Sequence, residues 1–443
     1  MELSFENVGK VAKAEIEVDL ITVIAGSNDT GKSTAGKILY SIYTALRDLA
    51  PEKLLRNKVE SIVSENQKLV NLLGELRVEE YGGGGFFGYG FSDYYESLSK
   101  NPAGNHESQE EFLNTCVKQW VQMQKERIKD EKFSNRNKKQ IEDTFQEMLA
   151  MADIKSNSKK IRLFSIQDVL LSEFSGSLTT ELYANLPAKI YLKEDSGNEM
   201  NFEFLANEID HNLSHIERKR EYEQPFYIDN PFVLDELNNP RRNISDDSYK
   251  HNDRMINAIE NPPMQNPFDK MLENKDIRSV LDSVVEGRIF KRGWRYQYQT
   301  SKMLNPVDIE NLSTGMKSFA ILKMLFDSQQ LDKIELLILD EPEIHLHPEW
   351  QLKYAELVVL LASKRPVQIV ITTHSPYFIE AIELYSKKHK IDEHVRYYNA
   401  DNREDGMSEI LDVTNKLEVL YESMSEPFQN LEELRDELDE EQI

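Results

Sequence analysis

GSNDTGKS at residues 26–33 decides the fold, because it fits the phosphate-loop pattern G-x-x-x-x-G-K-[ST]. It follows the β-type run IEVDLITVIAG at residues 16–26 and precedes residues 33–49, whose apolar side chains recur at helical spacing. A strand–loop–helix unit of this kind wraps backbone N–H groups around phosphate oxygens at the positive end of the helix. Lys32 is expected to reach the β- and γ-phosphates, and the Ser33 hydroxyl to ligate Mg²⁺. The predicted nucleotide contacts are Gly26, Asn28, Asp29, Thr30, Gly31, Lys32, Ser33 and Thr34.

A second candidate segment is the apolar run LLIL at residues 336–339, which is typical of a strand buried on both faces. Asp340 follows at the sheet edge where open α/β folds bind ligands, and we expect it to hold Mg²⁺ through water. Glu341 is then placed to orient and deprotonate an attacking water. A surface turn is the alternative for an isolated Asp-Glu pair, but the phosphate loop favours the metal-site interpretation.

Two further segments place polar side chains at the end of a predicted strand and at the start of a predicted helix. His374 ends the apolar run at residues 368–373, where a histidine can donate a hydrogen bond to the γ-phosphate. Ser313 and Gly315 precede an apolar helix at residues 319–326, and such a helix N-terminus can bind an anion. A plain helix cap is the alternative at Ser313, and sequence physics does not decide between the two.

These four segments, in this order, resemble the ATPase heads of the ABC superfamily in its SMC/RecF/OLD branch. STGM at residues 313–316 matches the signature loop, LILDEPEIHLHPEWQ at residues 337–351 the Walker B region, and THSPYF at residues 373–378 the switch-histidine region. The resemblance implies an α/β head with a mixed or parallel sheet, an antiparallel lobe and a mainly helical insertion. It also implies ATP and Mg²⁺ as cofactors, and self-association as a dimer or higher oligomer. In such an oligomer, Ser313 and Gly315 contact the γ-phosphate bound to the opposite subunit.

Two features depart from that family. The signature reads LSTGM where transporters have LSGGQ. The Q-loop has two candidates, Gln167 and the segment EFSGSL with Ser177 in place of the glutamine. His345 and His347 with Glu343 could form a metal set, but we interpret them as the structural turn leading into the helix from Pro348.

Within this branch, EWQLKYAELVVLL and THSPYFIEAIELYSKKHKID are most similar to stand-alone ATPases of prokaryotic anti-phage defence, Septu first and PARIS next. This resemblance implies an ATP-dependent sensor subunit that controls a separate nuclease of HNH or Toprim type, with a phage component or nucleic acid as trigger. The alternatives are a RecF-like DNA-repair clamp and an oligomeric scaffold that ATP holds together with little turnover.

Along the chain we predict five parts. Residues 1–49 and 303–413 form the two parts of the head, residues 50–160 a mainly helical insertion, and residues 161–302 a mixed region. Residues 414–443 form an acidic helix or tail. Within them, residues 105–152 predict a helical hairpin with arms of about 20 residues. Residues 161–209 include antiparallel strands, the glycine-aromatic patch at 81–95 is irregular, and residues 238–266 form a surface loop.

The net charge of −25 opposes DNA binding except at a local basic face. The candidates are GRIFKRGWRYQYQTSK at residues 287–302 and the cluster of Lys155, Lys159, Lys160 and Arg162. A solvated strand with one buried aromatic face is the more ordinary interpretation of the first. The single cysteine, Cys116, and the absence of a long apolar run or signal peptide predict a cytoplasmic protein with no membrane partner.

Overall fold

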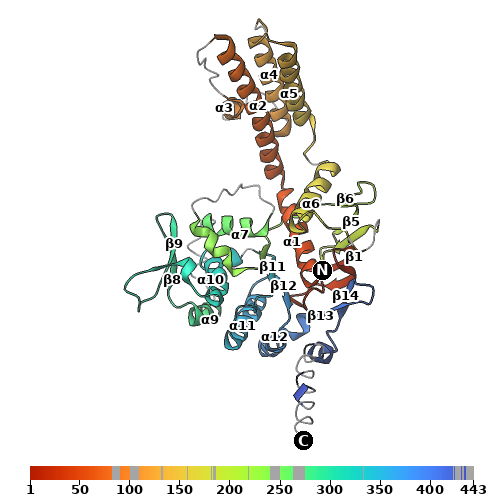
Figure 1. Ribbon diagram of the computed structural model, residues 1–443, viewed down its shortest axis with the longest axis vertical. Helices are drawn as coiled ribbons and strands as arrows, with labels where there is room; N and C mark the ends of the chain where they lie inside the picture. Colours follow the sequence, from red (N-terminus) through yellow and green to blue (C-terminus); the bar gives the residue numbers. More distant parts are fainter. Residues whose placement is uncertain are drawn as a thin grey trace. The chain divides into compact units, whose positions relative to one another are not determined.

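The chain forms two compact units in the computed structural model (Figure 1). The first, here called the head, comprises Met1–Arg47 and Leu163–Ile443, and the second, the helical unit, comprises Asp48–Arg162. The structure describes the chain except for residues 82–89, 100–108, 131–132, 157, 181, 183–185, 218, 240–249, 263–274, 333, 423, 425–430, 432–433 and 436–443.

The described part of the head is built on a mixed eleven-stranded sheet in the order β6-β5-β4-β1-β2-β14-β13-β3-β12-β11-β7. Strands β13, β3, β12, β11 and β7 are parallel, whereas β2, β1, β4, β5 and β6 pair antiparallel. Strand β14 joins the two parts, because it runs parallel to β2 and antiparallel to β13. The strands are β1 (Glu2–Val8), β2 (Val11–Glu17), β3 (Ile21–Gly26), β4 (Ala188–Lys193), β5 (Glu199–Leu205), β6 (Glu208–Ile209), β7 (Phe226–Ile228), β11 (Leu336–Asp340), β12 (Gln368–Thr373), β13 (Val395–Asn402) and β14 (Ser408–Asp412). The predicted α/β fold with an antiparallel lobe is therefore confirmed.

Burial on both faces explains why the central strands are continuously apolar. Every residue of β3 is buried, as are the first four residues of β11. Alternate residues of β3, β12 and β11 share one core with helices α10 to α12, of which α11 and α12 lie side by side (Figure 1). The head helices are α1 (Lys32–Asp48), α6 (Lys159–Glu173, which begins in the helical unit), α7 (His251–Glu260), α9 (Lys275–Val284), α10 (Thr314–Asp327), α11 (Pro348–Lys364) and α12 (Pro376–His389), with 3-10 turns at Pro231–Asn238, Ile309–Asn311, Gln330–Asp332 and Asp392–His394.

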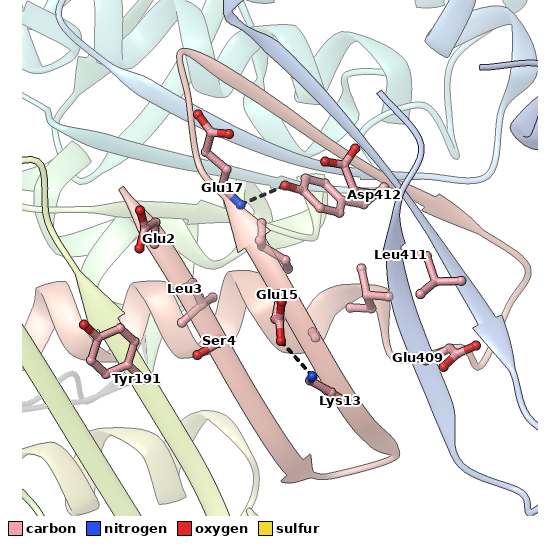
Figure 2. Close-up of a pocket in the computed structure, with 14 residues that line it drawn as sticks. Glu2, Leu3, Ser4, Lys13, Glu15, Glu17, Tyr191, Glu409, Leu411 and Asp412 are labelled. Carbon is pink, nitrogen blue, oxygen red and sulfur yellow. Dashed lines mark hydrogen bonds and ion pairs between the residues drawn. The ribbon is translucent and has the colours of Figure 1, made fainter. Parts of the chain in front are cut away.

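The antiparallel lobe alternates buried and exposed side chains, because one of its faces is open. Leu3 and Phe5 are buried, whereas Glu2 and Glu15 are exposed. The open face forms a groove of about 580 Å³ across β4, β1, β2 and β14 (Figure 2). Acidic side chains dominate its rim, and the Lys13 ammonium lies 2.7 Å from the Glu15 carboxylate.

The aromatic-basic segment forms a second sheet of β8 (Arg288–Arg292), β9 (Arg295–Gln299) and β10 (Val307–Asp308). Tyr296 and Tyr298 are buried, while Trp294 is exposed. The Arg295 guanidinium pairs with Asp308, and Lys302 lies 2.9 Å from Glu286. This is the ordinary arrangement of a strand with one buried aromatic face, and its cations are partly neutralised.

The helical unit contains α2 (Pro51–Tyr81), α3 (Phe91–Ser99), α4 (Gln109–Arg127) and α5 (Asn135–Asp153). Its core buries Cys116 and Trp120 of α4 against Phe145 of α5, and the Trp120 indole N–H donates to the Asn66 side chain at 2.8 Å. Helices α4 and α5 are 19 residues each, in agreement with the predicted arms. Cys116 is a buried thiol.

Two local predictions need correction. Residues 238–266 are not simply a loop, because His251–Glu260 forms helix α7, whose apolar residues pack into the head. The glycine-aromatic patch becomes helical from Phe91, where α3 begins, and its residues 82–89 lie outside the described chain. Most of the predicted acidic tail also lies outside the described residues. No helix in the described ranges combines the length and apolar character needed to cross a bilayer.

Candidate nucleotide-binding site

The predicted phosphate loop joins the end of β3 to the start of α1, as its pattern requires. Gly26 has φ +152°, and a Cβ added there would lie 2.2 Å from the Ala400 carbonyl oxygen. Gly31 has φ +75°, and its added Cβ would meet the Val11 side chain at 2.5 Å. Both positions therefore require glycine, since a side chain would fill the space that gives the loop its tight curve.

Hydrogen bonds within the loop hold this curve. The Thr30 hydroxyl donates to the Ser27 carbonyl at 2.9 Å, and the backbone N–H of Thr34 donates to the Gly31 carbonyl at 3.0 Å. Asp29 adopts φ +60°, and its carbonyl and carboxylate both accept from the Lys10 ammonium, at 2.6 and 2.7 Å. Lys10 lies in the turn between β1 and β2, and no motif marked it in the sequence.

The Lys32 ammonium is almost fully buried inside the loop. It donates to the carbonyls of Gly26 at 2.9 Å and Ser27 at 2.6 Å, and it lies 3.3 Å from the Glu341 carboxylate. The loop carbonyls and Glu341 therefore hold the Lys32 ammonium within the phosphate loop.

Ser33 and Asp340 meet although 307 residues separate them in the chain. The Ser33 hydroxyl donates to one Asp340 carboxylate oxygen at 2.8 Å, and the Thr372 hydroxyl bonds to the same oxygen. The other oxygen accepts from the Tyr227 hydroxyl at 2.6 Å. A hydroxyl and a carboxylate in contact beside a phosphate loop are the hard oxygen donors that Mg²⁺ takes, so the residues present fit this cation.

Glu341 and His374 face each other at the ends of β11 and β12. Glu341 has φ +49°, and its carboxylate lies 3.7 Å from the His374 imidazole. His374, and after it Lys32, lower the pKa of Glu341, while the Glu341 carboxylate raises the pKa of His374. The facing pair is therefore an ionised carboxylate next to an imidazole that retains its proton more readily than usual.

Glu343 is a residue of this site whose position the sequence did not reveal. Its carboxylate is buried and accepts from the Thr373 hydroxyl at 2.6 Å and from the backbone N–H of His374 at 2.9 Å. Burial raises the pKa of Glu343. Glu343 lies with His345 in the expected turn between β11 and α11, and its side chain also contacts the strand end that carries His374. The described residues contain no group of three or more metal-ligating side chains.

The candidate signature residues lie at the start of α10. The Ser313 side chain caps the helix by accepting from the Met316 N–H at 3.4 Å. An added Cβ at Gly315 would lie 3.1 Å from both the His345 carbonyl oxygen and the Trp350 ring. Among the described contacts, no hydrogen bond or ion pair joins Ser313 or Gly315 to the phosphate loop of the same chain.

Neither Q-loop candidate contacts the phosphate loop through a described hydrogen bond. The Gln167 side chain accepts from the Ile209 N–H at 2.8 Å and so supports β6. The backbone N–H of Ser177 donates to the Phe174 carbonyl at 3.0 Å. Glu173, at the start of the segment EFSGSL, instead binds His251 of α7 at 2.7 Å.

Comparisons with known proteins show what this chain is similar to. A family described as "AAA domain, putative AbiEii toxin, Type IV TA system" matches residues 172–380. The OLD nuclease of Thermus scotoductus is 35% identical over 99 residues, or 21% of this chain and 18% of that protein. The Septu protein PtuA of Bacillus thuringiensis is 44% identical over 46 residues, or 10% of this chain and 11% of that protein. The predicted resemblance to OLD and Septu proteins is therefore confirmed.

The extent of these matches is limited. The chain spans less than a fifth of the length of the curated relatives it matches. Among solved structures, an SMC head bound to the C-winged helix domain of ScpA has a TM-score of 0.42 at 12% identity, covering 93% of this chain and 97% of that chain. The SMC head domain from Thermotoga maritima has a TM-score of 0.35 at 11% identity, covering 93% and 98%. At these TM-scores the likeness adds nothing to the strand order described above.

Proposed function

We propose that this chain binds ATP with Mg²⁺ and hydrolyses it as the regulatory subunit of an anti-phage defence system. One observation carries the proposal: Lys32, Ser33, Asp340, Glu341 and His374, from three neighbouring parallel strand ends, converge on one phosphate loop. A fold alone does not define an activity, but this set of side chains suits phosphoryl transfer.

In this mechanism each side chain has a separate task. Ser33 and Asp340 would hold the metal, which when bound would neutralise charge on the phosphates. Lys32 exchanges the loop carbonyls and Glu341 for phosphate oxygens. Glu341, freed from Lys32, orients the attacking water and accepts its proton, and His374 donates a hydrogen bond to the transferred phosphoryl group.

We further propose that ATP lies between two copies of the chain. Ser313 and Gly315 form an anion-binding helix start that contacts no part of their own phosphate loop through the described bonds. Exposed apolar side chains also surround the catalytic segments: Ile344 follows Walker B, Leu352 lies on α11 and Tyr377 follows His374. Apolar surface next to a half-complete site supports association with a second copy.

The defence role and a separate HNH or Toprim nuclease rest on the similarity to Septu and OLD proteins. We also propose that the protein is cytoplasmic and that a phage component or nucleic acid is its trigger. The DNA-clamp alternative is weaker, because the net charge is −25 and the Arg295 guanidinium of β9 is paired with Asp308. The scaffold alternative differs only in turnover, so kinetics separates it.

Phosphate release and light scattering test the chemistry. Glu341→Gln should still bind ATP and form a larger species, while turnover falls about 100-fold or more because the proton acceptor is lost. Glu349→Gln makes the same charge change at an exposed position of α11 and should behave as wild type. Turnover of Lys32→Ala equal to wild type would favour the scaffold and contradict hydrolysis at this site.

A mixing experiment tests the shared site. Lys32→Ala and Ser313→Arg subunits should each be inactive alone. Mixed together, they form dimers in which one of the two sites combines an intact phosphate loop with an intact signature, so activity should return. Mixtures as inactive as their components, under conditions where the subunits exchange, would contradict ATP binding between subunits.

A further inference from the structure

Tyr227 contacts the Asp340 carboxylate from β7, the neighbour of β11 on the side away from β12. It lies on β7, which pairs in parallel register with β11 so that Ile228 is opposite Leu339. Its hydroxyl donates to the Asp340 oxygen that Ser33 does not contact, at 2.6 Å, and the side chain is almost fully buried. A Cβ added at Gly36 of α1 would lie 3.4 Å from the Tyr227 ring, so this glycine lets α1 approach it closely.

Behind Tyr227 lies a buried carboxylate–imidazole–carboxylate triad. His251 begins α7, and its ring centroid is 4.6 Å from that of Tyr227. One imidazole nitrogen is 2.7 Å from the carboxylate of Glu173, the last residue of α6, and the other is 3.0 Å from Asp229, just after β7. The backbone N–H of His251 also donates to Glu173, at 2.9 Å. The triad thus ties α6, β7 and α7 together around one aromatic ring.

We infer that Tyr227, held by the Glu173–His251–Asp229 triad, is a positioning residue for the metal-binding carboxylate of Asp340. This inference rests on the proposed function, in which Ser33 and Asp340 would both hold the cation and the Ser33 hydroxyl would no longer donate to Asp340. Asp340 then loses one of its hydrogen bonds, and Tyr227 keeps the second carboxylate oxygen oriented. Partners of this kind, one shell out from the metal, fix the direction in which a ligand presents its lone pairs.

The arrangement also connects the site to distant chain segments. Glu173 belongs to the helix that continues the chain from the helical unit, and His251 belongs to the segment between β7 and β8. A displacement of α6 or α7 would therefore change the packing around Tyr227, and through Tyr227 the orientation of the Asp340 carboxylate.

The test uses the full-length Tyr227→Phe variant, which keeps the ring and removes only the hydroxyl. Tyr354→Phe is the matched control, because the Tyr354 hydroxyl is buried on α11 and has no hydrogen-bond partner in the described structure. The readout is the affinity for a fluorescent ATP analogue, measured as Mg²⁺ is titrated and again in EDTA. In Tyr227→Phe, half of the Mg²⁺-dependent gain in affinity for the analogue should require about tenfold more Mg²⁺ than in wild type. The affinity measured in EDTA should be unchanged.

The outcomes separate this inference from the proposed function. If wild-type protein shows no Mg²⁺-dependent nucleotide binding, the proposed function fails. If wild type shows it and Tyr227→Phe requires the same Mg²⁺ concentration, the positioning role alone is overturned. A shift of equal size in Tyr354→Phe would also overturn it, by showing a general packing effect. His251→Gln should shift the Mg²⁺ requirement in the same direction, and no shift would refute the part assigned to the triad.

Discussion

The buried imidazole of His251 leads us to predict how the stability of the head depends on pH. The imidazole is buried between Glu173 and Asp229, with a side-chain exposure of 12%. Burial alone would lower its pKa, but the carboxylates of Asp229 and Glu173, which accept from the protonated ring, outweigh burial and raise the pKa of His251 from 6.5 to about 9. The protonated form is therefore the one that the folded head stabilises.

The size and sign follow from linkage between protonation and folding. The difference between the folded and unfolded pKa of His251 corresponds to on the order of 3 kcal/mol of stability, at about 1.4 kcal/mol per pH unit. Because the folded value is the higher one, this contribution is fully present below about pH 6.5. It is lost as the pH rises through about 9. Lys37 of α1 also acts on this site, since it helps to lower the pKa of Asp229.

The assay compares wild type with His251→Gln from pH 6 to pH 10. Urea unfolding is followed by tryptophan fluorescence, to which Trp294 and Trp350 of the head contribute together with Trp120 of the helical unit. At pH 6 the variant should be less stable, because two carboxylates then lie close together without the cation between them. The difference between the two proteins should shrink by on the order of 3 kcal/mol towards pH 10.

A control removes another histidine without disturbing the triad. His394→Gln changes an exposed imidazole of the head, and this variant should keep the pH dependence of wild type. If the difference between wild type and His251→Gln stays constant from pH 6 to pH 10, His251 is not held as a cation, and the reasoning is refuted.

Two further substitutions test the phosphate loop and the helical unit. Gly26→Ala should abolish nucleotide binding and lower the free energy of unfolding by on the order of 2 kcal/mol, because the new Cβ meets the Ala400 carbonyl. The control is Gly197→Ala, where φ is +78° and no atom lies within 4 Å of the added Cβ, so only the backbone dihedral is strained. Equal losses in melting temperature for the two variants would contradict the steric argument. Trp120→Phe should destabilise the helical unit by on the order of 1–3 kcal/mol in chemical denaturation, since the buried Asn66 side chain loses its donor; no loss would show that Asn66 finds another partner.

Local sequence patterns determined the elements that carry the candidate site. The phosphate loop was predictable because its glycines meet a backbone requirement within a few residues, between an apolar strand and an amphipathic helix. Strands β11 and β12 were predictable because burial on both faces makes them continuously apolar. Helix α7 was missed, because proline and asparagine on either side of it concealed the apolar spacing of Met255, Ile256 and Ile259.

Only the tertiary structure decided which distant side chains meet. Tyr227 contacts Asp340 because β7 lies beside β11 in the sheet. The order of the strands cannot be predicted from the sequence of any single segment. Glu173 and His251 likewise lie at the ends of two separate helices, and Lys10 lies in a turn next to the phosphate loop. Sequence spacing specifies which elements form, because the forces that shape a strand or helix act over a few residues. Contacts between elements depend on how all of them pack, and they become visible only in the folded chain.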